Sequence, residues 1–402
     1  MKSLRFTAVV LSGTAVWTIA AATPCRAQDG MGSTREVSPP DIVVTARRKS
    51  EVLQDVPQTI NAVTSETIEK LRINNASDIQ QVVPGISLES STSGSGAFGS
   101  SSSIRGVPTF LLSNATPVVQ FYMNEAPTGR GPEATSSLFD IGQIEVLKGP
   151  QGTLRGRSAP VGSITVTTRD PSMTEIGGYA NMSGSHLGNV NVQGAIGIPL
   201  INDVLALRLA GVIDRTDANG VTSANNPIEP KSNTEAWRAT LRFEPATNFN
   251  ASIMFQRQTR RTRTFDQVAG AGNGVNGPAI GPSDRLGITD EPSTSTGHTN
   301  YLVGNAEWFF ADQKLSYVGS YRDGSSVSMA VQDRANVIPG YEWHQTTHTP
   351  AKEMSHELRL SSDERIAGIF DYTVGAFFDR EWSQPTVRCI RKAGSGADPG
   401  NA

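Results

Sequence analysis

The sequence is poor in the residues that build disulfide frameworks and metal sites. It contains two cysteines and five histidines. Two cysteines cannot form a disulfide scaffold. His344 and His348 are four residues apart, but they fall in a predicted loop, where this spacing places them on no common face. We therefore expect neither a metal site nor a bound cofactor.

Unbalanced charge and long apolar runs are also lacking. The net charge is −3, which provides no basic surface for nucleic acid. Beyond the N-terminal segment, no run approaches the roughly eighteen apolar residues of a transmembrane helix. No serine has a G-x-S-x-G context, and the acidic residues form no recognisable catalytic pair. We expect a chain that is not an enzyme.

The N-terminus has the pattern of a secretory signal peptide, which we place at residues 1–27. Lys2 and Arg5 precede an apolar stretch at 6–22, and residues 25–27 form a small-x-small cleavage site. Cleavage there removes the first cysteine and leaves Cys389 alone. Any membrane-spanning part of the exported chain must then be built from β-strands.

The most informative stretch runs from Ile144 to Pro171. Ile144–Leu147 predicts a strand, and Gly149-Pro150-Gln151-Gly152 a turn. A basic loop and a second turn follow. Residues 164–168 are largely β-branched and predict another strand, which Asp170-Pro171 ends.

This stretch is similar to the end of the plug domain in TonB-dependent outer-membrane receptors. There, a strand, a G-P-x-x-x-L-(aromatic)-G turn and a closing strand precede the barrel. Gly149, Pro150, Gly152 and Gly156 match the turn, whereas Arg155 stands where an aromatic residue is usual.

The preceding elements resemble the same domain. We expect helices from Thr64 or Ser65 to Leu71 and at Ala76–Val83, and strands at Ile86–Glu89 and Val118–Met123. Residues 103–106 resemble the family's I-R-G strand. The resemblance implies an α+β plug at residues 50–171.

Asp41–Ala46 is a short β-prone segment with no expected partner strand nearby. Composition alone leaves two interpretations open: a first strand of the plug, which composition favours, or a segment that adds an edge strand to another protein. The resemblance favours the second, because the TonB box occupies this place within the linker at residues 28–49. It implies that the C-terminal domain of TonB binds Asp41, Ile42, Val43, Val44, Thr45 and Ala46.

Residues 172–402 alternate between apolar and polar positions, as a soluble sandwich or a membrane barrel would. The connections favour a barrel, because short turns and long loops occupy opposite rims. The expected strands lie near 175–185, 188–198, 203–215, 233–244, 249–261, 297–310, 313–325, 351–362 and 369–383.

The expected barrel is incomplete. About nine strands close into a barrel roughly 18 Å across, whereas a plug of about 120 residues is around 35 Å wide. About 22 strands give roughly 45 Å, which accommodates a plug. We therefore expect an antiparallel transmembrane β-barrel of which this chain holds the N-terminal part, and a partner for Cys389 in the remainder.

The resemblance also implies candidate contacts. Arg105 and Lys148 lie in plug strands where the family often pairs arginines with barrel glutamates, and Glu357 is a candidate acceptor that should face the lumen. Unrelated lumen charges are the alternative. Ser90–Ser103 and Phe110–Thr116 should be outward plug loops that touch ligand. A further set, Arg260, Arg261 and Arg263, could attract an anionic chelate or lipopolysaccharide, or form a solvated charge run.

Together these features predict an outer-membrane receptor that takes up a scarce ligand with energy transmitted by TonB. The resemblance implies a ferric siderophore or a similar chelate as the commonest cargo, with carbohydrates or aromatic compounds as alternatives. Expected partners are TonB, outer-membrane lipid and lipopolysaccharide, and the small-molecule ligand. A truncated, transport-incompetent fragment and a secreted soluble β-rich binding protein remain alternatives.

Overall fold

The protein is described from a computed structural model. The chain divides into two units, Met1–Asp41 and Ile42–Ala402, and the description concerns the second. The predicted signal peptide, Asp41 and Ala46 lie outside the described residues. These are 42–45, 51–56, 58–89, 101–109, 118–129, 137–152, 156–186, 188–268, 279–281, 283–333, 342–362 and 369–392.

The plug contains a five-stranded sheet with the order β3-β9-β10-β7-β8. Its neighbours are antiparallel except β10 and β7, which run parallel. The predicted strands at 144–147 and 164–168 are confirmed as parts of β9 and β10. The strands are β3 (Thr59–Thr64), β7 (Val119–Met123), β8 (Ala126–Pro127), β9 (Ile141–Lys148) and β10 (Gly162–Thr168).

Two short helical segments join β3 to the rest of the plug. The predicted first helix is confirmed as α1 (Ser65–Leu71), although its N-cap residue Thr64 makes no side-chain capping bond. The second is a 3-10 helix at Ala76–Gln81, which Asn75 and Asp78 cap reciprocally. Among the described residues, no helix is long and apolar enough to span a membrane.

Two small sheets complete the plug. One has the order β4-β5-β6, formed by β4 (Ile86–Glu89), β5 (Ser101–Ile104) and β6 (Val107–Thr109). The predicted loop at Ser90–Ser103 is therefore wrong at its end, because Ser101–Ser103 belong to β5. The other sheet pairs β1 (Val43–Val44) with β2 (Glu51–Val52).

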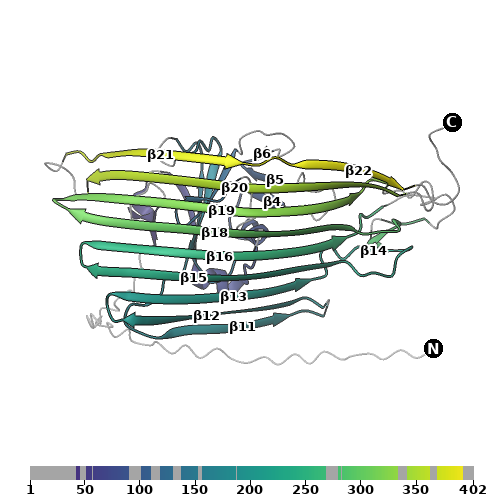
Figure 1. Cartoon of the computed structure of the whole chain (residues 1–402), viewed down its shortest axis with the longest axis horizontal. Coiled ribbons are helices and arrows are strands. Elements are labelled where there is room, and N and C mark those ends of the chain that lie inside the picture. The colour runs from purple at the N-terminus through teal and green to yellow at the C-terminus, as the bar shows by residue number, and fades with distance from the viewer. Residues whose placement is uncertain are drawn as a thin grey trace, which may run out of the picture. The chain divides into compact units, whose positions relative to one another are not determined.

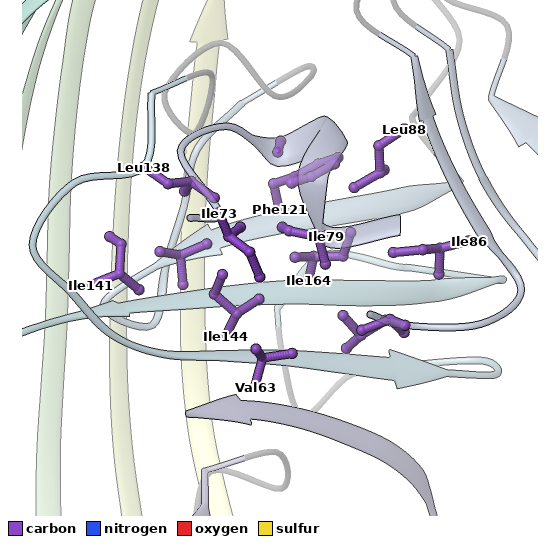
Figure 2. Packing of buried hydrophobic residues seen from close by; sticks show 14 of the residues in the cluster. Val63, Ile73, Ile79, Ile86, Leu88, Phe121, Leu138, Ile141, Ile144 and Ile164 are labelled. Atoms are coloured by element: carbon purple, nitrogen blue, oxygen red, sulfur yellow. The ribbon is translucent and has the colours of Figure 1, made fainter. Parts of the chain in front are cut away.

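The core of the plug lies between its main sheet and the two helical segments (Figure 2). Ile144 and Ile164 on adjacent strands are fully buried, and Phe121 and Ile79 lie in the same cluster. β-Branched side chains suit these central strands because they pack well on a pleated surface. This core makes the plug compact, and side chains at the surface of the plug extend to the strands that follow it in the sequence.

A second sheet, which we call the wall, contains all the long strands (Figure 1). Each of its strands is antiparallel to its neighbours, in the order in which they occur along the chain. The strands are β11 (Gly177–Gly184), β12 (Val190–Ile201), β13 (Leu205–Thr216), β15 (Lys231–Ala246), β16 (Phe249–Thr264), β18 (Ser293–Phe310), β19 (Gln313–Val331), β20 (Glu342–Ser362) and β21 (Thr373–Trp382).

The last wall strand is interrupted. β21 pairs with one part of β20, and β22 (Thr386–Lys392) pairs with another part of β20 in the same direction. Pro385 lies between them and has no N–H to continue the ladder. Cys389, for which the sequence predicts a partner in the remainder of the barrel, is exposed within β22.

The wall buries polar side chains and exposes apolar ones, which is the reverse of a sheet in a water-soluble protein. Buried positions on the face toward the plug include Arg208, Arg238 and Gln256, whereas Trp237 and Ile253 on the opposite face are nearly half exposed. A sandwich buries apolar side chains and exposes polar ones. The opposite arrangement is that of a strand with a polar interior on one side and lipid on the other.

The plug core supplies a stability test. We expect Ile164→Ala to destabilise the plug by about 2–5 kcal/mol, because it removes fully buried methylene groups from a packed cluster. Hydrogen exchange of the β9 and β10 amides would report the loss. Leu71→Ala, at an exposed position at the end of α1, is the control and should change exchange little. Equal effects from both changes would contradict this description of the core.

Candidate functional site

A first group of contacts joins the start of β9 to the wall. The Asp140 carboxylate accepts a hydrogen bond of 2.7 Å from Arg208 Nε on β13 and also contacts Arg208 Nη2. Asp140 itself has a positive φ of 53° and turns the chain into β9. Its carbonyl also accepts from the backbone N–H of Arg169. The backbone turn and the ion pair therefore fix the same residue.

Arg238 on β15 extends this group. Its side chain is fully buried, and its guanidinium lies 4.3 Å from the centre of the Phe139 ring. Arg238 Nη1 donates to the Phe139 carbonyl at 3.1 Å, and Arg238 Nη2 donates to Gln256 Oε1 at 2.7 Å. Plug backbone, plug ring and wall amide thus surround one wall cation.

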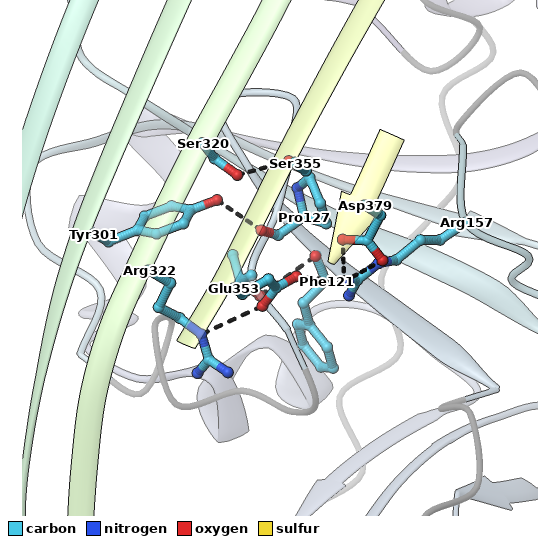
Figure 3. A network of polar contacts seen from close by, with 10 residues as sticks. Phe121, Pro127, Arg157, Tyr301, Ser320, Arg322, Glu353, Ser355 and Asp379 are labelled. Atoms are coloured by element: carbon cyan, nitrogen blue, oxygen red, sulfur yellow. Dashed lines mark hydrogen bonds and ion pairs between the residues drawn. The ribbon is translucent and has the colours of Figure 1, made fainter. Parts of the chain in front are cut away.

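A second group centres on Arg157, in the loop between β9 and β10 (Figure 3). Arg157 Nη2 lies 2.7 Å from Asp379 Oδ1 on β21 and 2.5 Å from Glu353 Oε1 on β20. Arg322 on β19 approaches the other Glu353 oxygen at 3.4 Å. Burial lowers the pKa of Arg157, but the carboxylates of Glu353 and Asp379 outweigh burial and hold this pKa above its ordinary value.

Gly156 brings this loop close to the wall. Its φ is +75°, and a Cβ there would lie 2.5 Å from a ring carbon of Phe377 on β21. Only glycine satisfies both the backbone conformation and the close approach. The predicted turn residues Gly149, Pro150 and Gly152 also lie in the connection after β9, and Gly149 has a φ of 119°.

A third group holds the β7–β8 hairpin. The buried Tyr301 hydroxyl on β18 donates to the Pro127 carbonyl at 2.8 Å (Figure 3). At the hairpin turn, Glu125 accepts a hydrogen bond of 2.8 Å from Arg359 Nη2 on β20. The plug is therefore anchored to strands from β13 to β21.

These anchors are polar, and their polarity determines how the interface between plug and wall holds together and how it can separate. Removing one member of a buried ion pair leaves an uncompensated charge, which costs about 3–5 kcal/mol. Yet charged side chains can exchange a partner for water, which a fused apolar core cannot do at similar cost. The interface can hold the plug firmly and still separate in discrete steps if water or another polar group enters.

The segment predicted to be the TonB box is docked on the plug. The expectation of no nearby partner strand is wrong, because Val43 and Val44 in β1 pair with β2. The Ile42 carbonyl accepts from Leu53 N–H at 2.8 Å. Val44 is fully buried and packs with Val56 and Leu147.

Two side chains of β9 form hydrogen bonds with this segment. Glu145 Oε1 accepts from Thr45 N–H at 2.9 Å and from the Thr45 hydroxyl at 3.1 Å. Gln143 Nε2 donates to the Val43 carbonyl at 3.0 Å. Glu145 is itself buried in the central region of the plug sheet. Residues 42–45 are thus bound directly to the strand that follows Asp140.

The predicted pairing of Arg105 or Lys148 with Glu357 stays a prediction. The contacts described for these residues join other partners: Lys148 Nζ donates to the Pro84 carbonyl at 2.6 Å, and Glu357 Oε1 lies 3.4 Å from Arg359 Nε. Burial, and then the nearby charge of Arg105, lower the pKa of Lys148. Arg105 adopts a positive φ of 54°, and its N–H donates to Gly85.

Other predicted positions have mixed outcomes. Residues 90–100, Phe110–Thr116 and Arg155 lie outside the described residues. The loop prediction for His344 and His348 is wrong, because both belong to β20, and His344 Nε2 lies 3.5 Å from Glu291. No cluster of three or more metal-ligating side chains occurs among the residues that the structure describes.

Asp140, Glu353 and Asp379 were not among the anchors predicted from the sequence. The position of Asp140 was one available signal. An acidic residue directly before a buried strand has no solvated loop into which its side chain can extend, so it needs a partner within the protein. Glu353 and Asp379 stand at positions of the alternation that face the plug, but alternation does not reveal which plug residue a wall charge meets. Arg157 and Asp379 are 222 residues apart in the sequence, so the local pattern around either residue does not indicate that they pair.

Comparisons with known proteins agree with this fold. Residues 52–163 match the family described as the TonB-dependent Receptor Plug Domain. The chain is 30% identical over 161 residues to the pesticin receptor of Yersinia pestis, covering 39% of this chain and 23% of that receptor. It is 33% identical over 127 residues to the vitamin B12 transporter BtuB of Vibrio vulnificus, covering 32% of this chain and 20% of that transporter.

A solved structure extends the similarity beyond the plug. The closed form of the ferric-catecholate import receptor Fiu from E. coli K12 superimposes with a TM-score of 0.67 at 19% identity. The match covers 85% of this chain and 50% of that chain. The likeness is one of fold, and it includes both plug and wall. The chain spans about half the length of this receptor, and its matches to the curated relatives span less than a quarter of theirs.

The Arg157 anchor can be tested by substitution. We expect Arg157→Gln to destabilise the attachment of the β9–β10 region by about 3 kcal/mol or more, because Glu353 stays buried without its closest cation. Hydrogen exchange of the β10 amides should accelerate roughly a hundredfold.

Two comparisons sharpen this test. Arg169→Gln breaks the half-exposed pair with Glu69 and should cost about 1 kcal/mol at most. Glu353→Gln in the Arg157→Gln background should recover part of the loss, because it removes a buried carboxylate that keeps only the longer contact with Arg322. Additive effects of the two changes would refute the proposed coupling between Arg157 and Glu353.

Proposed function

We propose that this chain, a TonB-dependent receptor plug followed by part of the receptor barrel, acts in the uptake of a scarce ligand across an outer membrane. In this proposal TonB energises the process through Asp41–Ala46. The proposal includes export by cleavage of the predicted signal peptide after residue 27. It places the apolar face of the wall in lipid, which the inverted burial of the wall supports.

The observation that carries this proposal is the docking of residues 42–45 on β9. A protein that gripped this segment by strand addition would pull on backbone that Glu145 and Gln143 hold. Force would therefore reach β9 without passing through a flexible linker. Asp140, at the start of the same strand, is the anchor to Arg208 on the wall.

This connection gives a route from pulling to plug movement. Glu145 and Gln143, which hold residues 42–45, lie on β9, and Asp140 directly precedes this strand. Displacement of β9 would therefore pull directly on the ion pair between Asp140 and Arg208. Water entering beside Asp140 and Arg208 can replace their mutual hydrogen bonds. We propose that the polar anchors let part of the plug shift while its apolar core near Ile144 and Ile164 stays folded.

The proposed cargo is a ferric siderophore or a similar metal chelate. Support comes from the import receptor Fiu, whose name specifies a ferric catecholate. The match to a vitamin B12 transporter shows that a related plug also occurs in a receptor for a different large ligand. Uptake of a carbohydrate or an aromatic compound would use the same coupling, and growth on each as the limiting nutrient distinguishes them.

Deletion of Asp41–Ala46 tests the coupling. We expect ligand binding to persist and uptake to stop, because the wall and the plug core remain while the segment that TonB would grip is lost. Binding to whole cells and accumulation inside them are measured separately for a ferric chelate. Deletion of residues 30–35, in the preceding linker, is the length-matched control and should leave both unchanged.

The outcomes separate the alternatives. Continued uptake after deletion of Asp41–Ala46 would refute the assignment of this segment. Loss of binding as well as uptake would indicate that the plug itself had unfolded, since Val44 is part of a buried cluster. A soluble binding protein would bind ligand without detergent, and its exposed apolar face would then require another explanation.

A further inference from the structure

We propose that the wall associates with a second copy of this chain inside the membrane, through His356 on β20. The imidazole of each copy would form a hydrogen bond with the imidazole of the other, across a twofold axis that runs along the membrane normal. This inference rests on the proposed location of the wall in an outer membrane. It goes beyond the proposed transport, which involves no second copy.

His356 lies within a band of apolar side chains on the face of the wall directed away from the plug. Directly opposed residues of neighbouring strands share a row and a face of the sheet. From the short turn between β18 and β19 outward, the rows on β18, β19 and β20 are Trp308, Leu315 and Leu360; Ala306, Tyr317 and Leu358; Gly304, Gly319 and His356; and Leu302, Tyr321 and Met354. The next row, Asn300, Asp323 and Lys352, is polar. His356 is therefore one row inside the edge of the band, and it is the one side chain in these apolar rows that can carry a positive charge.

The imidazole of His356 is exposed on this face, and its hydrogen bond uses one of its two nitrogens. The Tyr317 hydroxyl lies 2.7 Å from His356 Nδ1. Gly319 leaves room for this contact, because a Cβ there would lie 2.5 Å from the Tyr317 hydroxyl oxygen. The rings of Tyr317 and Phe378 stack with the imidazole at centroid distances of 6.1 and 6.5 Å. Within the part of the chain that the structure describes, His356 Nε2 has no hydrogen-bond partner.

A nitrogen without a partner is unfavourable at this position. At a surface in water the solvent satisfies such a group, whereas the hydrocarbon core of a membrane contains no water to do so. Tyr317 already occupies Nδ1, and the stacked rings offer no acceptor or donor to Nε2. The geometry therefore requires a hydrogen-bonding group from outside the wall, held at the depth of His356 in the membrane.

A second copy of the chain supplies such a group at the required depth. In a dimer whose twofold axis runs along the membrane normal, the same patch of both copies meets, and each residue stays at its own depth. His356 of one copy therefore meets His356 of the other where the axis passes beside β20. Neutral imidazole contains one donor and one acceptor, so the same residue can serve on both sides.

The Tyr317 hydroxyl allows the two copies to adopt opposite tautomers. When Tyr317 donates to His356 Nδ1, the ring proton is on Nε2, which becomes a donor to the other copy. When His356 Nδ1 carries the proton and donates to the Tyr317 oxygen, Nε2 becomes an acceptor. One copy in each state gives a continuous chain of hydrogen bonds, Tyr–His–His–Tyr, without net charge. Leu358 and Phe378, which are about half exposed beside His356, would be covered by the same contact.

Association in detergent micelles tests this inference. The full chain is purified in micelles, and the fraction of dimer is measured over a range of protein concentrations by sedimentation equilibrium. We expect a reversible dimer. His356→Phe should weaken it about tenfold, because this change keeps an aromatic ring and removes the hydrogen bond. His356→Gln should retain most of the association, because an amide also donates and accepts.

A second histidine provides the matched control. His298 on β18 is opposite Ser325 and lies on the same face as His356, but beyond the polar row that borders the apolar band. His298→Phe therefore makes the same chemical change outside the proposed contact. It should leave the fraction of dimer unchanged.

Cross-linking locates the contact on the wall. Variants with one cysteine are made in a chain that carries Cys25→Ser and Cys389→Ser. Phe378→Cys, directly opposite His356 on β21, should cross-link to the same position of the other copy through a short bismaleimide. Leu209→Cys, exposed on β13, lies six strand spacings from β21, or about 29 Å away, and should not cross-link.

The outcomes separate this inference from its alternatives. A dimer that is weakened by His356→Phe, kept by His356→Gln and His298→Phe, and cross-linked at position 378 supports it. A monomer at all concentrations, a dimer that His356→Phe leaves unchanged, or equal cross-linking at positions 378 and 209 overturns it. Cross-linking of position 378 in cells to a different membrane protein also overturns it. Because association in micelles requires neither ligand nor TonB, failure here is distinguishable from failure of the proposed transport.

Discussion

The structure depends on the burial of charge between the plug and the wall. Arg238, Arg208 and Glu353 all lie on the plug-facing side of the wall and are nearly inaccessible to water. A buried charge is tolerated only with a partner of opposite sign or a full set of hydrogen bonds. The plug supplies these through Asp140, the Phe139 carbonyl and Arg157. Plug and wall are therefore complementary at the level of individual ions.

The same constraint explains the two faces of each wall strand. Alternation with a period of two places Arg238 toward the plug and Trp237 away from it. One face needs the polar groups of the plug, and the other needs an apolar medium. Neither requirement can be met by water alone. The docked segment at residues 42–45 is held partly in the same manner, by the buried carboxylate of Glu145 on β9, and partly by the apolar packing of Val44.

The strands and the helix could be predicted from the sequence, but the contacts between them could not. The plug strands, α1 and the nine long strands follow from local pattern, because alternation, turn residues and β-branching act over a few positions. The ends of β18, β19 and β20 extend beyond the predicted ranges, since strand pairing continues into polar sequence such as Ser325–Ser328. The partners of the anchors could not be predicted, because the residues that Asp140 and Arg157 contact depend on the register of strands far along the chain.

That dependence has a consequence for the order in which the protein acquires its structure. Asp140 meets Arg208 across 68 residues, Arg157 meets Asp379 across 222, and Glu125 meets Arg359 across 234. Contacts between distant residues form late, because loop closure costs entropy before the contact rewards it. We therefore expect the β9 end of the plug to attach once β13 is in place, because Arg208 lies on that strand. Arg157 and Glu125 must wait for β20 and β21, so the plug is secured by stages as the wall grows past it.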